Sequence, residues 1–234
     1  MSSAQVGINY AGGTSTKLDY TFLSQSTNND DQIKGSKYLN DDFARGQISD
    51  FNDKIFAIRY DIYNDQMEFQ AGDGQIYVMN KNNVSREIVF LDSKTRYKLF
   101  DYISDEGNTK SGYFLILKSL GKYKILKKNR IIFIEAKESS TGYDAPHPAT
   151  YKKTKNRHYI VFDNAPGVLI DINKKKFSSL FKGQEKDVLN FIKKNKIKLS
   201  VDDDLIKVLN YLNPKWYPQR PNSLWFLTKI ELIF

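Results

Sequence analysis

The sequence predicts an α+β fold: an antiparallel β-meander sheet or open barrel, followed by two or three C-terminal helices packed on it. Three observations lead to this class. Residues 54–138 show the two-residue apolar alternation of strands, the connections between these strands are short, and residues 174–212 change to helical spacing. Short connections favour antiparallel neighbours, and a run of strands before a run of helices favours α+β over α/β.

The strand region opens at residues 54–69, where one parity is entirely apolar or aromatic: Phe56, Ile58, Tyr60 and Ile62. This pattern is typical of a strand with one buried face. Gly72-Asp73-Gly74 predicts a turn into a return strand at 75–79. Further strands are expected at 86–91, 97–103, 113–119, 123–127, 130–137 and 158–162.

Three later segments carry apolar residues at helical spacing, at 174–181, 185–194 and 201–212. The last of these begins with the acidic cluster Asp202-Asp203-Asp204, which has two interpretations, a cation site or a helix start. The cluster lacks the glycine and distal Glu of an EF-hand loop. Because Ser200 is placed as an N-cap and first-turn acids complement the helix dipole, we expect a helix start.

The domain organisation expected from composition has three parts. Residues 1–50, rich in Gly, Ser, Thr, Asn and Asp, read as a flexible N-terminal arm, with order beginning near Tyr38 or Phe51. Residues 51–213 form a single α+β domain. Residues 214–234 form an atypical apolar and aromatic tail after Asn213-Pro214, read as a docking segment, a last core strand, or an extension fused to the domain.

Composition excludes several kinds of chemistry. The chain has no cysteine and only two histidines, so disulfides, thiolate zinc sites, iron–sulfur clusters, cysteine nucleophiles and a three-histidine metal site are ruled out within it. No apolar run reaches the length of a membrane-spanning helix. No nucleophile elbow and no phosphate loop is present. The sequence therefore predicts no cofactor, no metal and no enzymatic activity.

Positive charge is concentrated in the second half of the chain. Residues 1–117 carry 12 basic and 16 acidic side chains, a net charge of −4, and residues 118–234 carry 24 and 11, a net charge of +13. This asymmetry suggests an anionic partner, with a merely solvated lysine surface as the alternative. The scarcity of Arg disfavours nucleic acid. The candidate contacts are Lys152, Lys153, Lys174, Lys175, Lys176, Lys193, Lys194 and Lys196. Candidate aromatic contacts are Trp216, Tyr217 and Trp225.

Four segments carry a family resemblance: YLNDDF at 38–43, IRYDIYNDQME at 58–68, FIKKNK at 191–196 and DDLIKVLNY at 203–211. Through them, residues of about 38–213 resemble a group of uncharacterised envelope or secreted proteins of Bacteroidota. The resemblance implies the periplasm or outer membrane and transfers no catalytic motif. The start of the chain lacks the apolar core of a signal peptide, although Ser2-Ser3-Ala4-Gln5 resembles the end of one. We expect a periplasmic or secreted protein if a signal peptide was removed.

Three functions compete at this point. The first is a non-enzymatic envelope accessory protein that docks on a larger partner, either anionic or associated with the outer membrane. The second is a module that binds a glycan or a lipid headgroup through aromatic strand faces or the tail together with the lysines. The third and least favoured is a carboxylate-based hydrolase, which requires two acids facing each other across a cleft.

Overall fold

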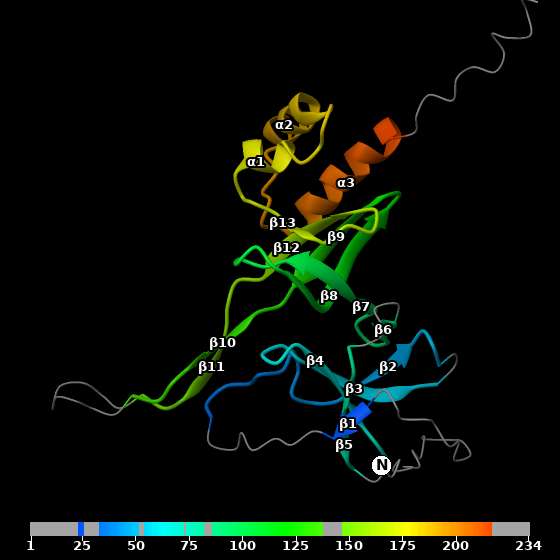
Figure 1. Cartoon of the computed structure of the whole chain (residues 1–234), viewed down its shortest axis with the longest axis vertical. Coiled ribbons are helices and arrows are strands. Elements are labelled where there is room, and N and C mark those ends of the chain that lie inside the picture. Colours follow the sequence, from blue (N-terminus) through cyan, green and yellow to red (C-terminus); the bar gives the residue numbers. More distant parts are fainter. Residues whose placement is uncertain are drawn as a thin grey trace, which may run out of the picture.

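The structure, a computed structural model, describes residues 23–25, 33–51, 54–72, 74–81, 86–137 and 147–216. Thirteen strands and three helices lie within these ranges (Figure 1). The strands are β1 (Leu23–Gln25), β2 (Ala44–Ile48), β3 (Phe56–Asp61), β4 (Gln66–Gln70), β5 (Ile76–Met79), β6 (Glu87–Phe90), β7 (Thr95–Ile103), β8 (Thr109–Leu120), β9 (Tyr123–Lys128), β10 (Ile131–Ile134), β11 (Thr150–Lys153), β12 (Arg157–Phe162) and β13 (Val168–Leu169). The helices are α1 (Lys174–Ser178), α2 (Glu185–Lys194) and α3 (Asp202–Trp216).

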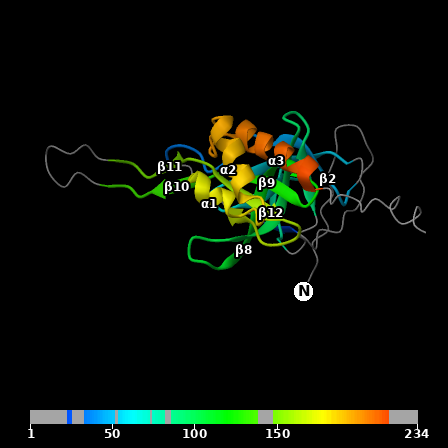
Figure 2. The ribbon, with the colours of Figure 1, turned by 90° about the horizontal axis from the view of Figure 1, so that it is seen from above.

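Eleven of the described strands form one antiparallel sheet in the order β1-β5-β4-β3-β2-β6-β7-β8-β9-β12-β13, bent into a half-barrel. It consists of two meanders, β2–β5 and β6–β9, which meet where β2 pairs with β6. Strands β10 and β11 leave the sheet and pair only with each other within the described strands. Figure 2 shows this ribbon projecting to one side of the molecule. The predicted α+β class, with an antiparallel sheet followed by helices, is confirmed.

The sequence predicted a flexible arm over residues 1–50, but residues 33–50 belong to the folded domain. Strand β2 lies inside the sheet between β3 and β6, and Gly46 has no room for a Cβ because the Ile58 side chain would lie 2.7 Å from it. Lys37 is buried and pairs with Asp61 at 3.6 Å. Prediction failed here because residues 33–50 are mostly polar, and the few apolar and glycine residues that place this segment in the sheet do not stand out in the sequence. Residues 1–22 and 26–32 lie outside the described part.

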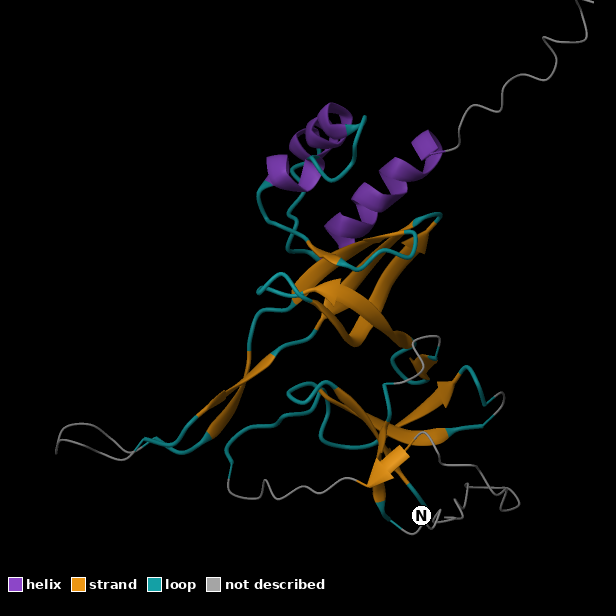
Figure 3. Ribbon diagram, in the orientation of Figure 1, coloured by secondary structure: helices purple, strands orange, loops and turns teal. Residues whose placement is uncertain are grey.

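The helices cover only one half of the sheet. Figure 3 shows all three on the side of β8, β9, β12 and β13. The apolar stripe of α3 faces this half, where Leu205, Val208, Leu209 and Leu212 are buried with Ile125 and Ile160 of the strands. The other half, around β2–β7, has its own core of side chains such as Ile58, Met67 and Tyr97. The prediction that the C-terminal helices pack on the sheet is confirmed.

A carboxylate joins the two halves. Asp65, in the turn between β3 and β4, accepts hydrogen bonds from the Tyr60 hydroxyl at 2.6 Å and from the ammonium groups of Lys81 and Lys128 at 2.9 Å each. Lys128 belongs to β9, which lies beneath the helices. Burial lowers the pKa of Lys128, and the nearby Asp65 opposes this shift. Part of the positive charge of the second half therefore serves folding.

The acidic cluster begins α3, as predicted, and also anchors that helix. Asp202 accepts a hydrogen bond from Lys127 Nζ at 2.7 Å, and its other oxygen lies 2.7 Å from Nε2 of His158. His158 itself is buried, with 7% of its surface exposed. The expected Ser200 N-cap is wrong by one residue: the Val201 carbonyl accepts the first helical bond, from Leu205.

Candidate functional site

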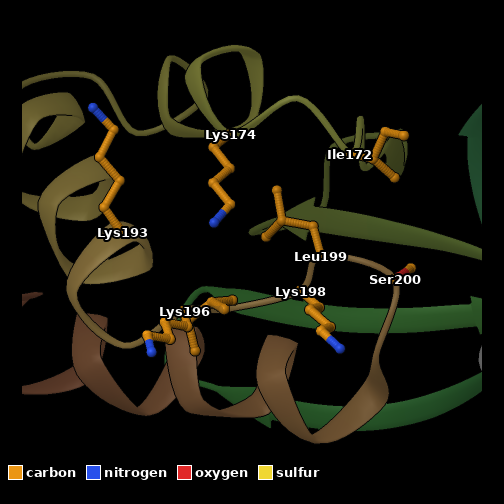
Figure 4. A pocket seen from close by; sticks show the side chains of 8 residues that line it. Ile172, Lys174, Lys193, Lys196, Lys198, Leu199 and Ser200 are labelled. Atoms are coloured by element: carbon orange, nitrogen blue, oxygen red, sulfur yellow. The ribbon is translucent and has the colours of Figure 1, made fainter.

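A hollow of about 500 Å³ lies between α1, the end of α2 and the segment that leads into α3 (Figure 4). It is open to solvent, and its lining residues come from all three segments: Ile172, Lys174, Lys193, Lys196, Ile197, Lys198, Leu199 and Ser200. We call it the lysine hollow, because four of these eight residues are lysines. Figure 4 shows Lys174 reaching from α1 toward Leu199 and the segment 196–200.

A helix cap and a glycine turn position α1 and α2 around the hollow. The Asn173 side chain caps α1 by accepting hydrogen bonds from the backbone of Lys175 and Lys176. Gly183, with φ of 81°, makes the left-handed turn between α1 and α2. Ile197 and Leu199, at the floor of the hollow, are buried in the hydrophobic core between the helices and the sheet. The floor of the hollow is therefore part of that core.

Helix α2 ends in a Schellman motif with a lysine at its left-handed position. The Ile197 N–H donates to the Ile192 carbonyl at 3.0 Å, and the Lys196 N–H donates to the Lys193 carbonyl at 3.2 Å. Lys196 has φ of 52°, a conformation that glycine or asparagine normally supplies. A side chain with a Cβ is disfavoured there, so the sequence places a cation at the rim at the expense of local stability.

The four lysines of the hollow have no ion-pair partner among the described residues. Other lysines of the chain do: Lys127 pairs with Asp202, Lys128 with Asp65 and Lys207 with Asp204. Asp171, three residues before Lys174, pairs with Lys176 instead, and Asp204 accepts a hydrogen bond from the backbone N–H of Lys198 rather than from its ammonium group. The lysine hollow is therefore a concentration of unneutralised positive charge.

Carboxylates beside the hollow are already engaged elsewhere. The pKa of Asp204 is lowered by the hydrogen bond from the backbone of Lys198 and then by the one from Lys207. For Asp202, burial would raise the pKa, but the hydrogen bonds from Lys127 and His158 outweigh it and leave the pKa lowered. Both groups are held as carboxylates, and neither lines the hollow.

The structure brings some of the predicted contact residues together and separates others. Lys174, Lys193 and Lys196 line the lysine hollow. Lys175 and Lys194 lie on the same two helices, outside the lining, and Lys176 is engaged with Asp171 at 3.2 Å. Lys198 lines the hollow although it was not among the candidate contacts. Its position between two buried side chains, Ile197 and Leu199, is a signal that could have found it.

The remaining candidates lie elsewhere. Lys152 and Lys153 are on β11 of the projecting ribbon, away from the helices (Figure 1), and Lys153 donates to the Leu39 carbonyl at 3.2 Å. The structure therefore does not place them in one patch with the helix lysines. Trp216 is the last residue of α3, with a side chain outside the described part, and Tyr217 and Trp225 lie outside the described residues altogether.

Comparison with known proteins adds no relative. No family model matches the chain, and neither does any curated protein or solved structure. Within the described ranges, no group of three His, Asp or Glu side chains is arranged to hold a metal ion. In that same part of the chain, no helix is long and apolar enough to cross a membrane. The site must therefore be interpreted from its own geometry and charge.

Proposed function

We propose that this protein is a non-enzymatic binding protein that docks on an anionic partner through the lysine hollow. One observation carries the proposal: Lys174, Lys193, Lys196 and Lys198 line one open hollow from separate segments, and no carboxylate of the described residues pairs with them. The family resemblance adds two further parts to this proposal. The partner is a larger component of the cell envelope, and the protein is periplasmic or secreted.

The electrostatics favour an external anion. Like charges gathered on one surface repel one another, and an anionic partner relieves this repulsion while the ammonium groups remain hydrated. The lysines are exposed or half-buried, so binding requires little desolvation. Such contacts are screened by salt over roughly 8–10 Å. Binding should therefore weaken steadily as ionic strength rises.

Helix stability alone does not account for the four lysines. Lys193 lies in the last turn of α2, where a cation complements the helix dipole. Lys196 is beyond the helix in a conformation that disfavours lysine, and Lys174 and Lys198 are outside α2. The hollow also lacks any carboxylate in its lining, which supports binding over carboxylate-based hydrolysis at this site.

The test is a binding measurement with charge-matched variants. Full-length protein is passed over immobilised dextran sulfate, with neutral dextran as reference, at low and physiological salt. The variant Lys174→Gln/Lys198→Gln loses two charges at the hollow, and the control Lys152→Gln/Lys155→Gln loses two on or beside the ribbon. We expect the hollow variant to associate several-fold more slowly and the control to bind like the parent.

Two results would remove the proposal. Equal losses in the two variants would mean that only the net charge matters and that the hollow is a solvated surface. Binding that does not change with salt would mean that the contact is not electrostatic. Circular dichroism and the urea midpoint of both variants serve as controls for folding, since exposed lysines contribute little to stability.

A further inference from the structure

Exposed apolar side chains lie beside the lysine hollow. Ile172, which lines it, is 76% exposed, the highest value among the large apolar side chains of the described residues. Val201, next to the lining residue Ser200, is 41% exposed. Burying such side chains is favourable, yet folding leaves both of them in water beside the hollow.

Lysines outnumber carboxylates around these side chains. Residues 171–204 contain nine lysines and six carboxylates, and three of these carboxylates are paired: Asp171 with Lys176, Asp202 with Lys127 and Asp204 with Lys207. Two others, Glu185 and Asp187, lie in the first turn of α2, at the opposite end of that helix from Lys193 and Lys194. The face that carries Ile172 is therefore both apolar at its tip and basic around it.

We propose that this face docks on a lipid bilayer that contains anionic phospholipids, with Ile172 inserted among the headgroups and the hollow lysines against their phosphates. This inference rests on the proposed function and names its partner. Stable attachment to a membrane surface generally needs two weak signals, and an apolar anchor with a basic cluster supplies both. A soluble anion would engage the lysines but leave Ile172 in water.

The shape of the site and the choice of residues support a surface over a small soluble ligand. The hollow is open rather than enclosed, so a small anion inside it would remain in contact with water. All four basic residues are lysines, which act as hydrated point charges on flexible stems and suit a diffuse field of phosphates. Bidentate recognition of one phosphate or of a base would favour arginine.

The expected effects follow from general membrane energetics. Each lysine near an anionic surface strengthens binding by about fivefold, so removing two weakens it by about 25-fold. Withdrawing one isoleucine side chain from the interface weakens binding by about tenfold or more. The lysine effect should fall with salt, and the isoleucine effect should not.

The experiment is co-sedimentation of the full chain with vesicles of phosphatidylcholine alone and with vesicles that also contain phosphatidylserine. Ile172→Ser is compared with Ile55→Ser, a matched change at a side chain that is 37% exposed on the other half of the sheet. The lysine pair variants described above complete the set. Each variant is also measured on dextran sulfate, a polyanion with no apolar layer.

Three results together support the inference. The protein binds vesicles that contain phosphatidylserine and does not bind vesicles of phosphatidylcholine alone. Ile172→Ser weakens binding to those vesicles by about tenfold and leaves binding to dextran sulfate unchanged. If Ile172→Ser leaves vesicle binding unchanged, the membrane inference is wrong while binding of anions by the hollow stands. If dextran sulfate binds through the hollow and the vesicles do not bind, the partner is a soluble or polymeric anion. If neither probe needs the hollow lysines, the proposed function fails as well.

Discussion

Lys196 allows stability and binding to be separated by one substitution. Its φ of 52° is the left-handed conformation, which costs an L-residue about 1–2 kcal/mol and glycine almost nothing. Glycine adds freedom to the unfolded chain, which offsets about 0.4–1 kcal/mol of that gain. Lys196→Gly should therefore raise the free energy of unfolding by about 0.5–1 kcal/mol while it weakens anion binding.

Lys94 provides the matched control. It lies in the exposed turn between β6 and β7 with φ of 54°, far along the chain from the hollow, and forms no ion pair with the described residues. Lys94→Gly removes the same charge and the same strain, so it should stabilise to a similar degree and leave binding intact. Urea unfolding measures stability, with an unchanged m-value as the check on comparability, and salt-dependent binding to dextran sulfate measures function.

The result that would refute this reasoning is specific. If Lys196→Gly destabilises the protein while Lys94→Gly stabilises it, Lys196 makes a structural contribution that its position at the end of α2 does not reveal. If both variants stabilise the protein and both bind like the parent, the lysine at this position has no role in the lysine hollow. Only stabilisation by both, together with weaker binding by Lys196→Gly alone, agrees with the proposal.

Three further predictions concern the framework that holds the site. Leu209→Ala, in the buried stripe of α3, should lower the free energy of unfolding by about 2–5 kcal/mol in urea melts; a loss under about 0.5 kcal/mol would contradict burial of that stripe. Asp65→Asn keeps a residue that tolerates the left-handed turn but leaves Lys81 and Lys128 without their carboxylate. It should therefore lower the free energy of unfolding by about 3 kcal/mol, whereas Asp92→Asn on the surface should change it little. Because the folded-state pKa of Asp202 is lowered, its stabilisation is complete above its unfolded pKa of about 4 and is lost as pH falls through the lower folded value. The difference in urea midpoint between the parent and Asp202→Asn should therefore shrink below about pH 4, and a constant difference down to strong acid would contradict this assignment.

Sequence reasoning succeeded where the signal was local. The alternation at Phe56, Ile58 and Tyr60 identified a buried strand face, and the spacing of Leu205 and Leu209 identified the buried face of α3. It could not show that β10 and β11 leave the sheet, because alternation marks a strand without revealing its neighbour. It also missed β2, since a central strand of five residues with a glycine and an arginine resembles a loop.

Only part of the candidate site could be predicted from the sequence, for a similar reason. Clusters along the sequence identified Lys174, Lys193 and Lys196, but whether clusters share a face depends on how α1 packs against α2. Strand β9 also carries lysines close together in sequence, yet its Lys127 and Lys128 pair with Asp202 and Asp65, which are distant in sequence. Ile172 had no sequence signal of its own, because its exposure is set by the turn between β13 and α1.

The position of β2 between β3 and β6 has a consequence for synthesis on the ribosome. Its pairing with β3 can form as soon as the first meander emerges, but its other edge needs β6, which begins 39 residues after Ile48. At about 5–20 residues per second, that edge waits roughly 2–8 s for its partner. During that interval the nascent chain presents an unpaired strand edge to its surroundings, the structural feature most prone to joining another chain. Slowing translation between residues 49 and 86 should therefore increase aggregation of the newly made protein, whereas the same delay after residue 162, when strands β2–β12 have been synthesised, should have far less effect.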